Sequence, residues 1–473
     1  MITSPAFYGK RYAVLGLARS GLATVDALLA SGAEVVAWDD REEARAQILP
    51  GTGRGTGEAG GGGSPHALRL AAIPLHHPAD GSPPPAGEDL LSVANPLEID
   101  LAGFDAIVVT PGLPLNKHPI AALAKAANVP VIGDIELFAQ ARPSLPPHKV
   151  VGITGTNGKS TTTALIHHII QTAGVPTTLG GNIGLPILGQ QPLPEGGIYV
   201  LELSSYQIDL TYSLDCDVGV LLNITPDHLD RYDGFEGYAA SKARLFLELM
   251  SREHIAVIAT EDEETRRIAN VFRHIREIDH DTLIEVSSAS ITDQSLWPAL
   301  QGPHNAQNAV AAIATACALG IPEEAIQEGL KTYPGLPHRM ERVRERDGVL
   351  FVNDSKATNP SSSSYALASY RAIHWILGGL PKGDRLDECA PMFGHVRAAY
   401  TIGEAGAMFA RLLAEAGKPV MESGTLAQAV RDAAAAARLG EVVLLSPACA
   451  SFDQFRDYEA RGDAFRAAVE ALA

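Results

Sequence analysis

Short apolar runs alternate with helix-like stretches along the chain. This alternation predicts parallel β-sheets covered by helices, which is an α/β fold. At the start of the chain it predicts a strand over Tyr12–Leu15, a helix from about Ser20 to Leu29 and a strand over Glu34–Trp38. A later stretch, FDAIVVTPG, is apolar enough for a buried strand and ends in a turn. This first unit is typical of a Rossmann-like domain.

Three domains are expected, because 473 residues are too many for one ordinary core. The first domain, residues 1–137, ends before the proline-studded stretch ARPSLPPHK. The second, residues 138–335, begins with a buried strand over Val150–Thr154. A second linker, YPGLPHR, spans Tyr333–Arg339. The third domain, residues 336–473, repeats strand–loop–helix units and is expected to be Rossmann-like again.

Residues 50–100 interrupt this pattern. They contain the stretches GTGRGTGEAGGGGSP and DGSPPPAGED, whose glycine and proline content cannot bury a core. We expect a long flexible insertion in the first domain, with one short strand near Leu68–Ile73.

The overall composition restricts the partners. With 46% hydrophobic and 19% charged residues, the chain is typical of a globular protein. Its net charge of -18 argues against a nucleic-acid partner, because phosphate backbones are bound by a surplus of Lys and Arg. No apolar run approaches the ~20 residues that span a bilayer, and the start does not resemble a secretion signal. We expect a cytoplasmic monomer that makes no membrane contact and has four free thiols: Cys216, Cys317, Cys389 and Cys449.

The stretch VVGITGTNGKST, residues 150–161, places a glycine-rich turn between a buried strand and a helix. Its leading glycine, Gly155, stands three residues before Gly158, closer than in the usual phosphate-binding loop. A plain turn with a surface lysine is the alternative, but strand, turn, Lys-Ser-Thr and helix occur together. We therefore predict a P-loop ATPase-like central domain. Its turn amides, lysine and hydroxyls would bind ATP phosphates and magnesium through Gly155, Thr156, Asn157, Gly158, Lys159, Ser160 and Thr161.

A carboxylate inside a predicted strand indicates a metal ligand. Glu202 lies in the apolar run Tyr199–Leu203, and a lone buried acid is costly unless it is paired or bound to metal. Beside a triphosphate loop, metal binding is the better explanation. His228 and Lys242 follow farther along the chain. On the residues alone, they are better interpreted as a packed or capping histidine and a solvated helix lysine.

The stretch GLARSG at Gly16–Gly21 is similar to a dinucleotide-binding fingerprint, but Ala18 takes the place of the middle glycine. Asp39 follows near the end of the second strand, where a ribose-binding acid would lie. This signal supports a diphosphate ligand and does not establish a nicotinamide cofactor.

Several stretches occur in an order that resembles a known family: GITGTNGKST, GGNIG, LELSSYQ, NITPDHLDRY, GPHNAQNAVAA, GLPHRME, NDSKATNP and LLSPACASFDQF. Together they resemble the ATP-dependent Mur ligases of peptidoglycan synthesis, over nearly all of the chain outside residues 50–100. The last two, with GDIELF at Gly133–Phe138, are most similar to the members that add D-glutamate to UDP-N-acetylmuramoyl-L-alanine. In this family the loop spacing that begins at Gly155 is the normal one.

The resemblance implies a role for each matching position. ATP and two magnesium ions would bind in the central domain, where catalysis would depend on Lys159, Glu202, His228 and Lys242. The metal ligands would be Ser160, Glu202, His228 and Lys242, and the nucleotide would also face Asn308, Arg339 and Asp354. The first domain would bind uridine diphosphate through Arg19, Ser20, Asp39, Asp40, Arg41 and Gly112, and Asn182 would contact the muramoyl group. D-glutamate would lie among Lys356, Thr358, Lys382, Ser451 and Phe452.

The resemblance also changes the interpretation of Lys242, because this position matches the lysine that the family carbamylates. Carbamylation replaces an ammonium by a carboxylate-like group that can ligate a metal ion. The implied reaction begins when the L-alanine carboxylate of the substrate attacks the γ-phosphate of ATP and forms an acyl phosphate. The D-glutamate amine then attacks the activated carbonyl, while protein groups position the reactants and neutralise charge.

The sequence departs from the family pattern in two places. The insertion follows the second strand, close to Asp40 and Arg41, and Tyr458 stands where phenylalanine is frequent. Three alternatives stay open: a sibling ligase that adds another amino acid or extends folate, a nucleotide-dependent switch, and an oxidoreductase that uses GLARSG. The two C-terminal motifs favour D-glutamate, and the combination of Glu202, His228 and Lys242 disfavours a switch.

Overall fold

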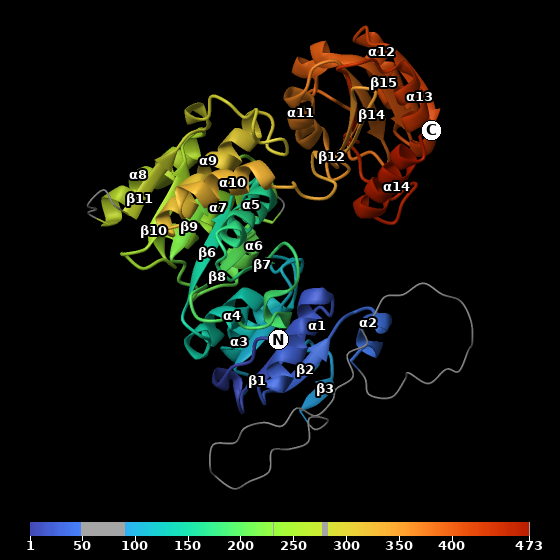
Figure 1. Ribbon diagram of the computed structural model, residues 1–473. Helices are drawn as coiled ribbons and strands as arrows, with labels where there is room; N and C mark the ends of the chain where they lie inside the picture. The colour runs from blue at the N-terminus through green and yellow to red at the C-terminus, as the bar shows by residue number, and fades with distance from the viewer. Residues whose placement is uncertain (49–89, 230, 277–281, 473) are drawn as a thin grey trace.

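The computed structural model describes residues 1–48, 90–229, 231–276 and 282–472. These residues form three β-sheets with helices packed against them, which follow one another along the chain (Figure 1). The expected α/β fold is confirmed. The strand expected near Leu68–Ile73 lies outside the described residues. No helix in the described ranges is long and apolar enough to cross a membrane.

The first sheet consists of β1 (Arg11–Leu15), β2 (Glu34–Trp38), β3 (Leu91–Val93), β4 (Ala106–Val109) and β5 (Val131–Ile132). Its strand order is β3-β2-β1-β4-β5, and all neighbours are parallel. The strand predicted over Glu34–Trp38 is confirmed residue for residue. The predicted insertion extends too far, because β3 is an ordered edge strand paired with β2. The helices of this part are α1 (Arg19–Ala30), α2 (Glu42–Ala46), α3 (Ile120–Ala127) and α4 (Asp134–Ala141).

The central sheet has six parallel strands in the order β11-β10-β9-β6-β8-β7. They are β6 (His148–Thr154), β7 (Thr177–Gly181), β8 (Gly197–Glu202), β9 (Val218–Leu221), β10 (Ile255–Ala259) and β11 (Leu283–Val286). The helices are α5 (Lys159–Thr172), α6 (Ser205–Asp209), α7 (Gly234–Leu247), α8 (Glu263–Arg276), α9 (Pro303–Ala318) and α10 (Glu323–Thr332). Strand β6 lies between β8 and β9, so its carboxyl end opens at the middle of the sheet.

Helix α5 is held on the sheet by a fully buried apolar face: Leu165, Ile166, Ile169 and Ile170. The spacing of these residues follows the helical repeat, so they point to one side. They belong to one core with residues of α9 and α10. This packing fixes the amino end of α5 directly after the carboxyl end of β6, which is where the phosphate loop lies.

The third sheet has the order β12-β13-β17-β14-β15-β16. Its strands are β12 (Glu341–Arg346), β13 (Val349–Asn353), β14 (Ile373–Gly378), β15 (Val396–Ile402), β16 (Val420–Gly424) and β17 (Val442–Leu445), and only the β12–β13 pair is antiparallel. The helices are α11 (Pro360–Ser369), α12 (Gly406–Glu415), α13 (Leu426–Ala436) and α14 (Tyr458–Glu470). From the sequence, the stretch VVLLSPACASFDQF predicts a strand, a loop and then a helix that starts near Ser451. The helix begins seven residues later, at Tyr458, because Asp457 is its cap and accepts from the Ala460 amide.

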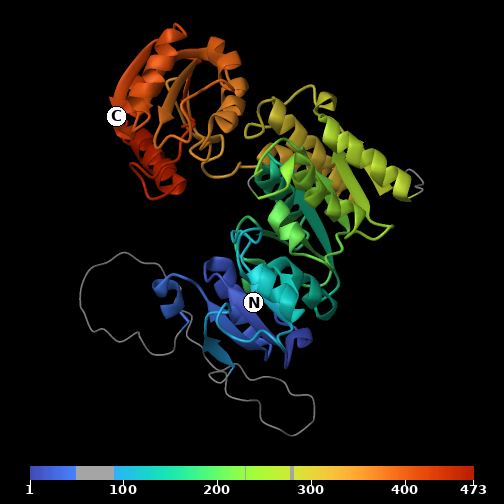
Figure 2. The same ribbon diagram turned by 180° about the vertical axis from the view of Figure 1, so that it is seen from behind.

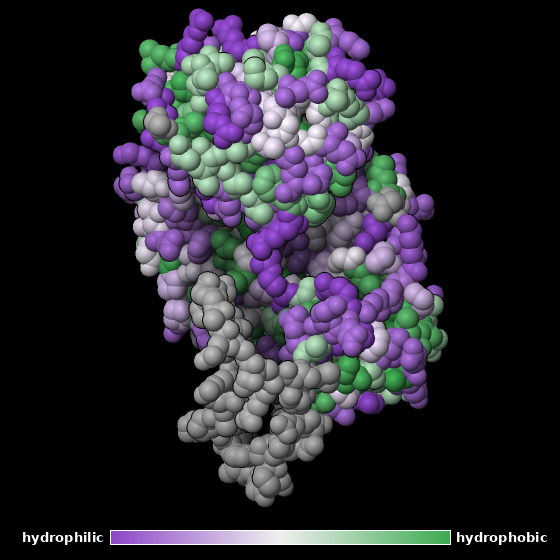
Figure 3. Space-filling model, turned by 90° about the vertical axis from the view of Figure 1, so that its right-hand side faces the viewer, coloured by the Kyte–Doolittle hydropathy of each residue, from purple (hydrophilic) through white to green (hydrophobic). Residues whose placement is uncertain are grey.

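The central sheet lies between the other two (Figure 1, Figure 2). Helix α4 joins the first two parts, since Glu136 accepts from the amides of Tyr212 (2.7 Å) and Ser213 (2.9 Å). A view from the side shows a recess in the surface between the C-terminal part and the parts below it (Figure 3). The domain boundaries after residues 137 and 335 stay a prediction, and the first of them falls inside α4.

Candidate active site

The phosphate-binding loop predicted after β6 is a tight turn folded around its own lysine. Lys159 Nζ donates to Gly155 O (2.9 Å) and Thr156 O (2.8 Å). Gly158 has a φ of 84°, and a Cβ there would lie 2.2 Å from Asn308 Oδ1. Only glycine therefore fits at this position. Ser160 and Thr161 are buried in the first turn of α5, so the loop, the lysine and the hydroxyls lie together as expected.

Glu202 is buried at the carboxyl end of β8, the strand beside β6, and pairs in register with Ile153. Its Oε1 accepts from Asn182 Nδ2 (2.8 Å), whereas its Oε2 is buried and has no hydrogen-bond partner among the residues that the structure describes. A buried carboxylate oxygen that lacks a donor is costly unless a cation or a substrate group meets it. The residues present therefore fit a metal ion. No cluster of three or more His, Cys, Asp or Glu among the described residues could hold one alone, so other ligands would complete the site.

Lys242 is buried in α7, and the solvated-lysine interpretation of the bare sequence is wrong. Its Nζ donates to Gly155 O (2.9 Å), the carbonyl that Lys159 also uses. Burial, followed by repulsion from Lys159, lowers the pKa of Lys242 well below its usual value. The phosphate loop thus has a second amine beneath it, whose burial disfavours the protonated form.

His228 is exposed and lies in a turn after β9, with a φ of 53°. Its Nε2 lies 3.6 Å from Asp227 Oδ2. Tyr238 connects it to the buried lysine: the Tyr238 ring centroid is 6.2 Å from that of His228 and 4.7 Å from Lys242 Nζ. The structure therefore brings Lys159, Glu202 and Lys242 together around the loop and places His228 at its open side.

Two residues that the sequence did not single out hold this arrangement. Asn223 accepts from Asn157 N (2.8 Å) and donates to Asn157 O (3.2 Å), so one side chain binds both backbone groups of a loop residue. Arg231 stacks on Tyr206, with 4.2 Å from its guanidinium carbon to the ring centroid, and donates to Leu113 O (2.9 Å). Both stand near His228 in NITPDHLDRY, and only the tertiary structure separates their roles.

The residues predicted to face the nucleotide come from the central and C-terminal parts of the chain. Asn308 in α9 is buried, and its Oδ1 accepts from Thr162 Oγ1 (3.2 Å). The Nε of Arg339 is buried and has no hydrogen-bond partner within the described part of the chain. The pKa of Lys159 is lowered mainly by burial; Glu202 opposes this shift, and the charge of Arg339 adds to it. Asp354 accepts from Ser446 Oγ (2.9 Å) and Met340 N (3.2 Å), and burial raises its pKa to about 7.

The residues predicted to surround D-glutamate lie on loops at one end of the third sheet. Lys356 Nζ donates to Tyr458 Oη (3.3 Å), and Lys382 Nζ donates to Thr358 Oγ1 (3.5 Å). The pKa of Lys356 is lowered by burial and then by Arg339, while Glu202 raises it. Ser451 is buried, and its carbonyl accepts from Gln454 N and Phe455 N in a turn. Phe452 is 69% exposed and has its ring free to cover a ligand.

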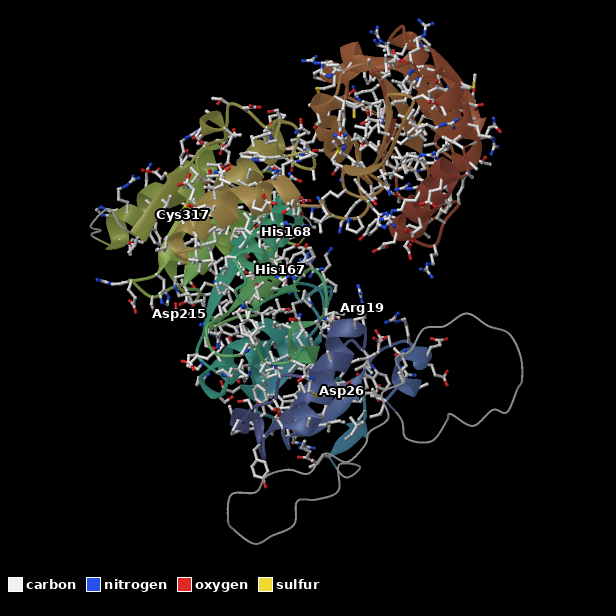
Figure 4. The ribbon with its side chains drawn as sticks, in the orientation of Figure 1. Arg19, Asp26, His167, His168, Asp215 and Cys317 are labelled. Carbon is white, nitrogen blue, oxygen red and sulfur yellow. The ribbon has the colours of Figure 1, made fainter. Side chains whose placement is uncertain are left out.

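The residues predicted to bind uridine diphosphate surround the amino end of α1, where Arg19 lies on the side that faces the central sheet (Figure 4). A hollow of about 320 Å³ opens there, lined by Leu17, Ala18, Arg19, Leu22, Arg41, Glu43, Ala44 and Gln47. Asp39 accepts from Leu17 N (2.8 Å) and Arg41 Nε (3.1 Å); burial opposes its ionisation, but these bonds hold its pKa at about 2.

The other residues predicted to contact the uridine substrate are not among those that line this hollow. Asp40 Oδ1 accepts from Trp38 Nε1 (3.2 Å), and Ser20 lies in the first turn of α1. Gly112 follows β4, and its carbonyl accepts from Arg231 Nη1 (3.3 Å). Asn182 lies after β7 and is held by Glu202 through both its side chain and its backbone N–H. The muramoyl contact and the metal ligand are therefore neighbours.

Known proteins are similar in sequence to this chain along its whole length. The Mur ligase middle domain matches residues 153–316, and the Mur ligase glutamate ligase domain matches residues 338–449. A UDP-N-acetylmuramoylalanine–D-glutamate ligase from Novosphingobium aromaticivorans is 60% identical, over 100% of this chain and 97% of that protein. Proteins of the same name are 55% identical in Zymomonas mobilis, over 100% of both chains, and 42% identical in Agrobacterium fabrum, over 100% of this chain and 97% of that one.

Solved structures share the fold. UDP-N-acetylmuramate-alanine ligase from Thermotoga maritima has a TM-score of 0.56 at 16% identity, with 98% of this chain and 100% of that chain covered. MurF from Acinetobacter baumannii has a TM-score of 0.52 at 18% identity, with 78% of this chain and 91% of that chain covered. The chain therefore belongs to the Mur ligase family, among the UDP-N-acetylmuramoylalanine–D-glutamate ligases.

Proposed function

We propose that this chain uses ATP to join D-glutamate to UDP-N-acetylmuramoyl-L-alanine, through an acyl phosphate. The observation that carries the proposal is the buried Glu202 beside the phosphate loop, one oxygen of which has no partner in the described ranges. It occurs in a chain 60% identical to a UDP-N-acetylmuramoylalanine–D-glutamate ligase. The L-alanine carboxylate attacks the γ-phosphate, ADP leaves, the D-glutamate amine attacks the acyl phosphate and phosphate is released. The amide bond forms without a covalent link to the enzyme.

The central part would bind the ATP phosphates and the metal. The amides of Gly155, Thr156, Asn157 and Gly158 and the side chains of Lys159, Ser160 and Thr161 would surround the phosphates. Lys159 Nζ, which now donates to two loop carbonyls, would exchange one of them for a phosphate oxygen. Two magnesium ions, held by Ser160, Glu202, His228 and Lys242, would neutralise charge on the transferred phosphate.

Carbamylation of Lys242 is supported by the surroundings of its amine. A buried ammonium would repel the magnesium ions beside Glu202, whereas a carbamate supplies two oxygens that a hard cation prefers. Burial favours the neutral amine, which is the form that reacts with carbon dioxide. Lys242 therefore acts as a metal ligand only after modification.

The outer parts would bind the two substrates that are joined. Asn308, Arg339 and Asp354 face the nucleotide, and Lys356, Thr358, Lys382, Ser451 and Phe452 surround D-glutamate. Two lysines in one pocket suit an amino acid that carries two carboxylates. The hollow beside Arg19 and Arg41 takes the uridine diphosphate with Ser20, Asp39, Asp40 and Gly112, and Asn182 directs the muramoyl group to Glu202.

The three ligand sites would correspond to three domains, residues 1–137, 138–335 and 336–473, in a monomer that works in the cytoplasm on soluble precursors. A change of mass tests the reaction. Incubation with ATP, magnesium, UDP-N-acetylmuramoyl-L-alanine and D-glutamate should give a product heavier than the uridine substrate by one glutamyl residue. ATP hydrolysis without such a product would contradict the proposal.

A further inference from the structure

A buried guanidinium lies beneath the loops of the proposed D-glutamate pocket. Arg461, in the first turn of α14, is 1% exposed. Burial lowers its pKa to about 10, so that it keeps its charge at neutral pH. Within the described ranges, no carboxylate lies within 4.0 Å of it; Asp453 and Asp354 attract it from farther away. A buried charge that has no acid partner is expensive, so it calls for an explanation beyond stability.

The guanidinium joins two of the loops that carry the predicted pocket. Nε donates to Ser355 Oγ (3.0 Å) and Nη2 to Ser355 O (2.8 Å). Nη1 donates to Cys449 O (3.1 Å) and Ala450 O (3.2 Å). Ser355 directly precedes Lys356, and Ala450 directly precedes Ser451. Four bonds from one side chain therefore set the distance between the loop after β13 and the loop after β17.

The same group also reaches the other two segments of the pocket. Ala450 O accepts a second bond from Leu380 N (3.0 Å), two residues before Lys382. Ser355 Oγ, which accepts from Arg461, donates in turn to Tyr458 O (2.8 Å). The packing is tight, because a Cβ on Gly379 would lie 3.1 Å from Arg461 Nη1. Every segment that bears a predicted D-glutamate contact is thus bonded to Arg461 directly or through one residue.

We propose that Arg461 is the positioning residue of the amino-acid pocket, which fixes the spacing of Lys356, Lys382 and Ser451 and adds a permanent positive charge beneath them. The charge is only partly offset by carbonyl and hydroxyl dipoles, so its field favours a ligand with two carboxylates. The inference rests on the proposed function, since the pocket is defined by D-glutamate. Arg461 itself does not touch the substrate.

Three variants test this role. Arg461→Ala removes the charge and the bonds, and Arg461→Lys keeps the charge but loses the planar fork that reaches both loops. Arg344→Met is the matched control, because Arg344 bonds the far end of α14 through Val469 O (3.4 Å) and is remote from the pocket. Steady-state kinetics should give a KM for D-glutamate raised about tenfold or more in Arg461→Ala, and less in Arg461→Lys, because the bonds that set the spacing of the loops are lost. KM for ATP and for the uridine substrate should stay unchanged.

Two further readouts separate positioning from general stability. The first half-reaction needs no D-glutamate, so the acyl phosphate trapped by borohydride should form in Arg461→Ala as in the wild type. Added guanidinium ion should lower the KM of Arg461→Ala for D-glutamate and leave Arg344→Met unaffected. An unchanged KM for D-glutamate in either folded Arg461 variant, or an equal rise for ATP, would overturn the inference.

Failure of the proposed function would look different. If the wild-type protein ligates another amino acid and not D-glutamate, the assignment of the substrate is wrong. A rise in KM for that amino acid in Arg461→Lys would still support the positioning role. If Arg461→Ala does not fold, Arg461→Lys alone decides, since it keeps the buried charge and the volume of the stem.

Discussion

At the scale of single residues, the state of Lys159 indicates what it does when ATP arrives. Its amine donates to Gly155 O and Thr156 O, two neutral acceptors that a charged phosphate oxygen would outcompete. Lys159→Ala should therefore lower kcat by about 100-fold or more, the usual loss when a donor to the transition state is removed. Phosphate release measures it. The exposed Lys149→Ala on β6 is the control and should be as active as the wild type.

The proposed chemistry of Lys242, a carbamate that ligates a metal ion, differs most from the interpretation of the bare sequence, which was a solvated helix lysine. Lys242→Ala should lose most of the activity, and added acetate or formate should restore part of it by filling the vacated space beside Gly155 with a carboxylate. Lys242→Arg keeps a positive charge but cannot form a carbamate, so it should stay inactive. Turnover in the presence of increasing acetate measures both. An active Lys242→Arg protein would show that the site uses the charge itself.

Asp354 makes stability depend on pH. Burial raises the pKa of its carboxyl from 3.8 to about 7. Between these values the unfolded chain ionises first, so the folded state binds more protons and the contribution of this group to stability falls as the pH rises. Asp354→Asn removes that dependence. Its stability relative to the wild type should therefore increase from about pH 4 to pH 7, by at most about 1.4 kcal/mol per pH unit.

Urea unfolding of both proteins at several pH values in this window measures the difference. A gap that stays constant with pH would mean that the carboxyl of Asp354 titrates normally in the folded state.

At the scale of elements, the phosphate loop is shaped from outside as well as by its own glycines. Asn223, which follows β9, binds both backbone groups of Asn157 and donates to Gln307 Oε1 (2.8 Å). Asn223→Ala should loosen the loop and raise KM for ATP by about 30-fold, for two bonds of ~1 kcal/mol each. Initial rates at varied ATP test it. Asn270→Ala on the exposed face of α8 should leave KM unchanged; a similar rise there would argue against a local effect.

Elements with a clear apolar pattern could be predicted, and those set by distant contacts could not. Strand β2 was predicted with its exact bounds, because its short apolar run contains no residues that favour a turn there. The start of α14 was misplaced because Ser451 and Asp457 are both residue types that cap helices well. The first turn of α14 is bonded to Ser355, which accepts from Arg461 and donates to Tyr458 O, and Ser355 is distant in the sequence. The burial of Lys242 was missed because the sequence of α7 by itself indicates a helix with a solvated lysine. Lys242 is buried because its amine lies against the end of β6.

The candidate site divides in the same way. Lys159 and Glu202 were placed from the residues, because a loop of known chemistry and an acid in an apolar strand are local signals. Positions outside these local signals, such as Asn182 and Arg339, came from the resemblance to the family. Arg461 and Asn223 were singled out by neither route, although Asn223 stands in the motif NITPDHLDRY, because the partners that define their roles are distant in the sequence.

At the scale of the whole molecule, the three sheets carry the three groups of ligand loops, and the central sheet lies between the other two (Figure 1). The hollow beside Arg19 belongs to the first sheet, the phosphate loop to the central sheet, and Lys356 and Lys382 to loops of the third sheet. This order matches a substrate whose uridine end and reacting carboxylate are far apart. Selection of the amino acid would then depend on the third sheet alone.

The most direct test of this account is ATP-dependent phosphate release with UDP-N-acetylmuramoyl-L-alanine and a panel of D- and L-amino acids, one at a time. We expect sustained release with D-glutamate, little or none with L-glutamate or neutral amino acids, and none when the uridine substrate is left out. Equal release with L-glutamate, or faster release with an amino acid that has a single carboxylate, would contradict the assignment of the pocket and of the reaction.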